Sequence, residues 1–91
     1  MVADVDWHGG AAPITALIDI RLRPGADDAA FEEAVIRLPG VVSVEHLAGP
    51  VHYVVRLSLS GMEAIDTTIR HLKEQLGAET NTRIVTRTLR G

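Results

Sequence analysis

The chain has 91 residues and a mass of 9.8 kDa, which is the size of a single domain. Hydrophobic residues make up 46% and charged residues 23% of the sequence, the balance of a folded globular domain rather than of a disordered chain. The net charge is −3, and the nine Lys and Arg residues are spread along the chain, so the sequence predicts no basic surface for nucleic acid. No apolar stretch reaches the roughly 18 residues that a membrane span requires.

The first residues differ in character from the rest of the chain. Residues 1–13 show no hydrophobic period and end in Gly-Gly-Ala-Ala-Pro, so we expect a flexible leader before a domain that covers residues 14–91. This leader carries Asp4 and Asp6, whereas a secretory signal peptide begins with positive charge. Cysteine is absent, which excludes disulfides and thiolate metal sites. We therefore expect a cytoplasmic protein.

A strand and a helix are predicted first. Residues 14–22 alternate apolar and polar side chains, which predicts a strand that ends at the turn formed by residues 23–25. Residues 27–28 are aspartates and candidate N-caps for a helix whose apolar side chains recur at helical spacing as far as Leu38. Residues 39–40, Pro-Gly, are expected to end this helix.

A hairpin is predicted next, with strands at residues 41–48 and 51–59 and a turn at Gly49-Pro50. In the tightest register Ala48 faces Val51, and the side chains then separate into a nearly apolar face and a mixed face. The apolar face carries Val42, Val44, His46, Ala48, Val51, Tyr53, Val55, Leu57 and Leu59. The mixed face carries Val41, Ser43, Glu45, Leu47, His52, Val54, Arg56 and Ser58.

A second helix and a last strand complete the predicted fold. Residues 60–63 have the pattern of a capping box, in which the Ser60 hydroxyl accepts a hydrogen bond from the Glu63 amide. Apolar residues then recur at helical spacing until Gly77, and residues 80–90 are predicted to form a strand. The order strand, helix, strand, strand, helix, strand predicts a ferredoxin-like α+β sandwich: a four-stranded antiparallel sheet with both helices on one face.

The sheet face that the helices leave uncovered suggests self-association. It is predicted to carry several apolar residues among polar ones: Leu17, Val41, Leu47, Val54 and Val85 among Thr15, Asp19, Ser43, Arg56 and Arg83. Such a face can also be a solvated surface with scattered apolar residues. We expect a symmetric homodimer instead, with an interface formed by Leu17, Leu47, Val54, Arg56 and Val85.

The sequence contains no recognisable catalytic or cofactor motif. It has no nucleophile elbow, zinc-protease helix, phosphate-binding loop or dinucleotide-binding glycine pattern, so we predict no catalytic residue and no cofactor. His46 and His52 flank the predicted turn, but the register points them to opposite faces of the hairpin. We therefore predict no metal site from this pair.

Three short segments, each on the expected element, carry a family resemblance. They are residues 38–44, Leu-Pro-Gly-Val-Val-Ser-Val; residues 48–57, Ala-Gly-Pro-Val-His-Tyr-Val-Val-Arg-Leu; and residues 80–85, Thr-Asn-Thr-Arg-Ile-Val. Together they resemble the C-terminal effector domain of the Lrp/AsnC family of bacterial regulators. The second segment is similar to the family's Gly-x-x-Asp turn and the strand after it, and the third to the family's Thr-x-Thr-x-Ile-Val strand.

The resemblance implies how such a domain works. It implies a dimer built through the sheets, often assembled into rings of dimers, with a small effector, usually an amino acid, bound where dimers meet. The implied effector site is formed by the turn and the last strand: Gly49, Pro50, Val51, His52 and Tyr53, with Thr80 and Thr82.

The sequence departs from the family pattern in two respects. The usual helix-turn-helix has no counterpart in residues 1–13, so the chain resembles free-standing versions of the domain, which do not bind DNA alone. The resemblance also implies a further partner, the full-length regulators that carry the DNA-binding half. His52 stands where the family commonly has Asp, and a neutral imidazole cannot supply the charge that pairs with a ligand ammonium. An acidic or otherwise different metabolite is therefore an alternative to an ordinary amino acid.

Two other functions stay open at this stage. Some haem-pathway decarboxylases resemble the family, and His46 or His52 could contact a haem or sirohaem tetrapyrrole or donate a proton. Those enzymes usually retain a helix-turn-helix-like half. The other alternative is a pure assembly module without a ligand.

Overall fold

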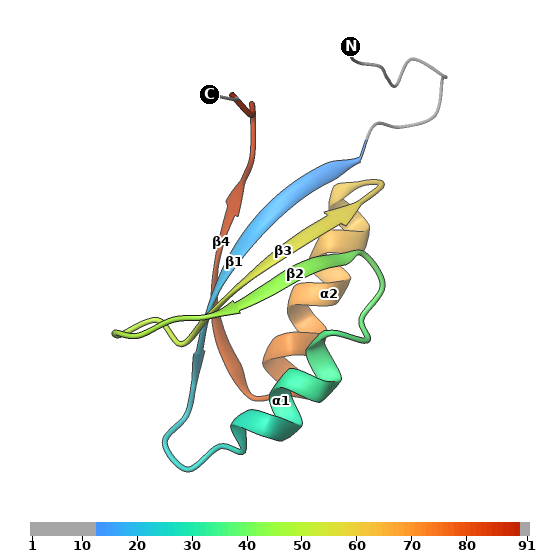
Figure 1. Cartoon of the computed structure of the whole chain (residues 1–91). Coiled ribbons are helices and arrows are strands. Elements are labelled where there is room, and N and C mark those ends of the chain that lie inside the picture. The colour runs from blue at the N-terminus through green and yellow to red at the C-terminus, as the bar shows by residue number, and fades with distance from the viewer. Residues whose placement is uncertain (1–12, 90–91) are drawn as a thin grey trace.

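The computed structural model describes residues 13–89, so the predicted leader lies outside the described residues except for Pro13. Six elements follow in chain order: β1 (Ile14–Leu22), α1 (Asp28–Val35), β2 (Val41–His46), β3 (Tyr53–Leu59), α2 (Met62–Glu74) and β4 (Ala78–Ile84). The strands form one antiparallel sheet in the order β2-β3-β1-β4, with both helices on the same face (Figure 1). The predicted ferredoxin-like fold is confirmed. Within residues 13–89 no helix is long and apolar enough to cross a membrane.

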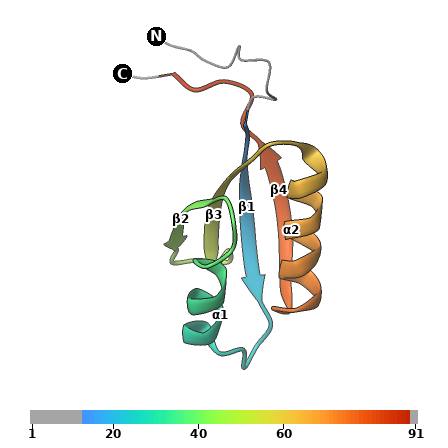
Figure 2. The ribbon, with the colours of Figure 1, turned by 90° about the vertical axis from the view of Figure 1, so that its right-hand side faces the viewer.

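The core lies between the sheet and the two helices. Alternation along β1 turns Ala16, Ile18 and Ile20 toward the helices, and all three are fully buried. On the helix side, α2 lies next to β4 (Figure 2) and also contacts β3, while α1 contacts β2. β1 pairs with both β3 and β4, so it is one of the two inner strands of the sheet, together with β3.

The first helix begins as its sequence predicts. The Asp27 side chain accepts a hydrogen bond from the Ala30 amide at 3.1 Å, which satisfies one free N–H of the first turn. Phe31 and Val35 are the buried residues of α1. The regular helix ends at Val35, and Leu38 packs against the core from the turn that follows.

The predicted capping box of the second helix is wrong. The N-cap of α2 is Gly61 with a φ of 141°, and no side chain caps the helix. Ser60 therefore lies one residue before the N-cap, and its hydroxyl does not bond the Glu63 amide. Glycine takes this backbone conformation at no steric cost, so the helix begins through a backbone turn instead of a side-chain cap.

The hairpin register is confirmed in part. Ser43 pairs with Arg56 and His46 with Tyr53, as predicted, but the register shifts between Val41 and Ser43 at a β-bulge. The bulge turns Val41 onto the core, against the prediction that it lies on the uncovered face. For the same reason Val42, predicted on the apolar face, is 61% exposed.

Three strands are shorter than predicted. The two hairpin strands stop at residue 46 and resume at residue 53, although Leu47 still donates from its amide to the His52 carbonyl at 2.8 Å. The last strand covers Ala78–Ile84 rather than residues 80–90. A further bond, from the Val85 amide to the Thr15 carbonyl at 2.8 Å, extends its pairing with β1.

Gly40, at the entrance to β2, gives a stability prediction. Its φ is +84°, and a Cβ there would lie 2.7 Å from the Ser58 carbonyl oxygen and 2.5 Å from the Leu59 side chain. Gly25 has a φ of +83° with nothing within 4 Å of the same position, so it is a matched control. In urea denaturation we expect Gly25→Ala to lower the free energy of unfolding by about 1–2 kcal/mol. We expect Gly40→Ala to lower it by about 3 kcal/mol or more, because steric overlap adds to the backbone cost. Equal losses in the two variants would contradict the close approach at Gly40.

Candidate functional site

The β2–β3 connection (residues 47–52) projects from the sheet on the side away from the helices (Figure 1). Three hydrogen bonds fasten it to the end of β1. Arg21 donates from Nε to the Pro50 carbonyl at 3.1 Å, and the His52 amide donates to the Ile20 carbonyl at 2.9 Å. The Leu22 amide donates to Nδ1 of His52, also at 2.9 Å. The last residues of β1 therefore position the connection.

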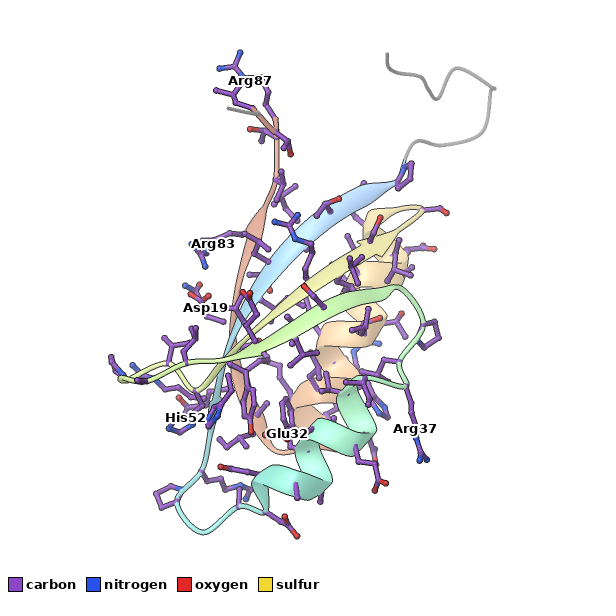
Figure 3. The ribbon with its side chains drawn as sticks, in the orientation of Figure 1. Asp19, Glu32, Arg37, His52, Arg83 and Arg87 are labelled. Carbon is purple, nitrogen blue, oxygen red and sulfur yellow. The ribbon has the colours of Figure 1, made fainter. Side chains whose placement is uncertain are left out.

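His52 has a structural role that the sequence did not indicate. Because its Nδ1 accepts a main-chain hydrogen bond, this nitrogen carries no proton, and the neutral ring has its proton on Nε2. The prediction that His46 and His52 point to opposite faces is wrong, since both line one hollow of about 290 Å³ with Asp28 (Figure 3 labels His52). His52 lies outside the strands, so strand alternation does not set its direction. Among residues 13–89 no three His, Asp or Glu side chains are placed to hold a metal ion.

The sheet face opposite the helices, here the open face, consists of alternate residues of the four strands: Thr15, Leu17, Asp19, Arg21, Ser43, Glu45, Val54, Arg56, Ser58, Glu79, Asn81 and Arg83, with Val85 beside β4. Arg83 donates to the Asp19 carboxylate at 2.6 Å, and both lie on the side of the sheet opposite Glu32 and Arg37 (Figure 3). The face has three arginines and three acids, so its formal charge is zero: Arg21, Arg56 and Arg83 with Asp19, Glu45 and Glu79.

Four of the five predicted interface residues lie on the open face. Leu17 and Arg56 are direct register partners, and Val54 is two residues away from Arg56 on the same strand. Leu17, Val54 and Val85 are half-buried, and Arg56 is exposed. Leu47 stands in the β2–β3 connection and is 37% exposed.

A pocket of about 250 Å³ lies between the β2–β3 connection and β4, lined by Asp19, Arg21, Val51, Glu79, Thr80 and Asn81. It brings together Val51 and Thr80, two residues of the effector site predicted from sequence. Four of its lining residues belong to the open face, so the pocket is part of that face. Sequence reasoning missed Arg21 and Glu79, the two lining residues whose opposite charges are adjacent in the sheet register.

The other predicted site residues lie elsewhere. Gly49 and Pro50 are exposed in the β2–β3 connection. Thr80 pairs with the buried Ile20 and Thr82 with the buried Ile18, so alternation directs both side chains to the helix side, and Thr80 borders the pocket around Val51 from its main chain. Tyr53 is 1% exposed on the helix side, where its hydroxyl donates to Glu32 at 2.5 Å. Neither Thr82 nor Tyr53 lines the pocket around Val51 and Thr80.

A larger groove of about 720 Å³ lies on the helix side, lined by Asp27, Ala29, Ala30, Glu32, Glu33, Ile36, Val44, His46 and Tyr53. Its wall includes the His46 ring, stacked on the Tyr53 ring with 4.8 Å between centroids. The sequence signals for this groove are the acidic residues of α1 and the isoleucine that follows this helix, Ile36, which is 61% exposed in the structure.

Tyr53 gives a second prediction, because it is the single tyrosine of the chain. Burial, the hydrogen bond to Glu32 and the negative charges of Asp28 and Glu32 raise the pKa of Tyr53 well above its ordinary value of 10.0. The folded state favours the neutral phenol. The contribution of Tyr53 to the free energy of unfolding is therefore complete below pH 10.0 and is lost as the pH rises toward and through the raised pKa.

We therefore expect the ultraviolet absorbance of phenolate to appear in the folded protein only well above pH 10.0. In Glu32→Gln the pKa of Tyr53 should fall but stay above the ordinary value, because burial is the largest cause and remains. Titration of folded wild-type protein at the ordinary value would contradict the buried environment of the hydroxyl.

Known proteins resemble this chain both in sequence pattern and in fold. Residues 15–90 match the model of the Lrp/AsnC ligand binding domain. No curated protein matches the sequence. Among solved structures, an AsnC family transcriptional regulator from Agrobacterium tumefaciens is similar with a TM-score of 0.78 and 19% identity, over 100% of this chain and 61% of that chain. LrpC of B. subtilis is similar with a TM-score of 0.78 and 19% identity, over 98% of this chain and 61% of that one.

A feast or famine regulatory protein from M. tuberculosis, complexed with L-methionine, has a TM-score of 0.78 and 14% identity, over 99% of this chain and 61% of that one. At these identities the similarity shows the fold, and the chain spans about three fifths of the length of these three regulators. The family match covers the sheet and both helices. The resemblance found in the sequence is thereby confirmed, and the chain belongs to the Lrp/AsnC ligand-binding domain family.

Proposed function

We propose that the chain is an effector-binding and self-association module of the Lrp/AsnC regulator type, with a small metabolite of the amino-acid class as its effector. The observation that carries this proposal is the pocket of about 250 Å³ beside the β2–β3 connection, which joins Val51 and Thr80. Its volume lies below the roughly 300–1,000 Å³ of sites for drug-sized ligands, and a single amino acid is correspondingly smaller than such ligands. The family description and the neighbour that was solved with L-methionine support the same class of ligand.

We further propose that the open face packs against a second copy of the chain, as a homodimer that can assemble into rings and with full-length regulators of the family. A two-fold interface must be complementary to itself. The open face fits this requirement because its formal charge is zero, while the half-buried Leu17, Val54 and Val85 supply apolar surface. Lack of DNA binding by this chain alone is part of the proposal, and it is supported by the balanced charge of this face.

The proposal is non-enzymatic. It is supported by the engagement of both histidines near the β2–β3 connection in structural contacts: His46 stacks on Tyr53, and His52 accepts from the Leu22 amide. Titration with haem or sirohaem is accordingly expected to leave the Soret band unchanged. A Soret shift that disappears in His46→Ala or His52→Ala would instead support the decarboxylase-like alternative.

The proposed function is tested by particle mass and ligand-dependent stability. Light scattering at micromolar concentration should give a mass several times the 9.8 kDa of one chain. A thermal-shift screen of L-amino acids and related metabolites should identify a stabilising compound, because a ligand at 100 times its dissociation constant adds about 2.7 kcal/mol to the free energy of unfolding. A monomer overturns the self-association proposal. A larger particle that no compound stabilises overturns effector binding and supports a pure assembly module.

A further inference from the structure

We infer that Arg21 and Glu79 together recognise the carboxylate and ammonium groups of the effector, an inference that rests on the proposed function. The two residues are direct register partners on β1 and β4. Both lie on the open face and both line the pocket beside the β2–β3 connection. Opposite residues of an antiparallel pair have Cβ atoms about 5 Å apart, so both side-chain ends can reach one small ligand.

Arg21 is prepared for a carboxylate. Its Nε donates to the Pro50 carbonyl at 3.1 Å, which fixes the plane of the guanidinium group. The two terminal nitrogens of that group remain for a bidentate pair with a ligand carboxylate. Arg21 would therefore bind the ligand and, through its contact with Pro50, also help to hold the β2–β3 connection.

Glu79 is the acid of the pocket whose carboxylate is available to pair with a ligand ammonium. The other acid in the lining, Asp19, accepts from Arg83 at 2.6 Å. Glu79 is exposed and, among the described residues, makes no ion pair, not even with its register partner Arg21. A ligand that carries an ammonium beside a carboxylate could lie between these two side chains, with its carboxylate paired with Arg21 and its ammonium paired with Glu79. Asn81 lies beside Glu79 in the lining as a further hydrogen-bonding side chain.

This assignment accounts for the departure at His52. The side chain at this position is a neutral imidazole, and its Nδ1 accepts from the Leu22 amide instead of facing the pocket lined by Val51. The connection thus supplies no charge for an ammonium. Glu79 supplies it from β4, across the pocket, and the effector can remain an ordinary zwitterionic amino acid.

The experiment combines charge-deleted ligands with charge-deleted proteins. The full chain is titrated calorimetrically with L-methionine, L-leucine and L-alanine, and with the amide and the N-acetyl derivative of each. The amide lacks the carboxylate and the N-acetyl derivative lacks the ammonium. For at least one amino acid, wild-type protein should bind the zwitterion at least about tenfold more tightly than either derivative, because charged hydrogen bonds are the strong ones.

The variants should each lose one half of this discrimination. Arg21→Gln should weaken the zwitterion at least about tenfold and leave the affinity of the amide unchanged. Glu79→Gln should weaken the zwitterion similarly and leave the N-acetyl derivative unchanged. Arg70→Gln and Glu74→Gln remove charges that are exposed on α2, away from the open face and the pocket, and should leave all three affinities unchanged.

The possible failures are distinguishable. If wild-type protein binds none of the probes, both the proposed function and this inference are overturned. Unchanged affinity for the zwitterion in both pocket variants overturns the inference alone. Sedimentation of each variant separates a structural role, because loss of self-association with equal weakening of all three ligand forms would also overturn it.

Discussion

Replacing Leu17 with lysine should convert the self-associated protein into folded monomers. Leu17 lies on the open face of the central strand, between its register partners Arg56 on β3 and Arg83 on β4. Lysine would replace an apolar contact with a third cation in this row, and two-fold symmetry would repeat the change in the partner. If each of the two copies loses at least about 1.4 kcal/mol of association free energy, the dissociation constant of the dimer rises at least about 100-fold.

Sedimentation equilibrium over a range of concentrations measures this effect. Ala64→Lys is the matched control, since Ala64 is exposed on α2 and its lysine would lie on the opposite side of the molecule. The control should keep the wild-type mass, and Leu17→Lys should keep the wild-type circular dichroism. A Leu17→Lys protein with the mass of wild type would remove the open face as the site of association.

The neighbouring substitution, Ile18→Ala, should act on folding instead. Ile18 is fully buried against the helices and lies at the centre of the sheet, paired with Val55 and Thr82. Removing its side chain should lower the free energy of unfolding by about 2–5 kcal/mol, through lost burial and the cavity left behind. This is a large share of the 5–15 kcal/mol that is typical of a domain.

Urea denaturation is the measurement, carried out in the Leu17→Lys background because the stability of an associating protein depends on its concentration. Adjacent residues on one strand are thus expected to have separate effects, one on particle mass and the other on unfolding. A loss below about 1 kcal/mol for Ile18→Ala would contradict its central place in the core.

The fold could be predicted because its main determinants are local. Alternation along residues 14–22 and the helical spacing after Asp27 each specify an element and the face that it buries. The bulge could not be predicted, because Val41 and Val42 are both apolar and the pattern does not say which one faces the core. The entry into α2 was mistaken because Ser60 and Glu63 have capping-box spacing, whereas the conformation of Gly61 sets the start of the helix.

The candidate site could be predicted only in part. The resemblance indicated Val51 and Thr80, which share a pocket, and also Thr82 and Tyr53, which lie on the helix side. The pocket depends on which residues of β1 and β4 are opposite each other. These two strands are the first and the last of the chain, far apart in the sequence. Nothing local in the sequence fixes that register, so the pairing of Arg21 with Glu79 becomes visible only in three dimensions. The direction of His52 depends in the same way on a distant amide, that of Leu22.

The bulge in β2 limits the ways in which copies of this chain can join. β2 is an outer strand, and a regular outer strand offers evenly spaced amides and carbonyls on which a foreign strand can add. Where the bulge inserts an extra residue before Ser43, this spacing is interrupted and the strand twists away from a straight template. Continuous growth of the sheet from molecule to molecule through this border is thereby disfavoured, which protects a small β-rich protein from fibrous aggregation.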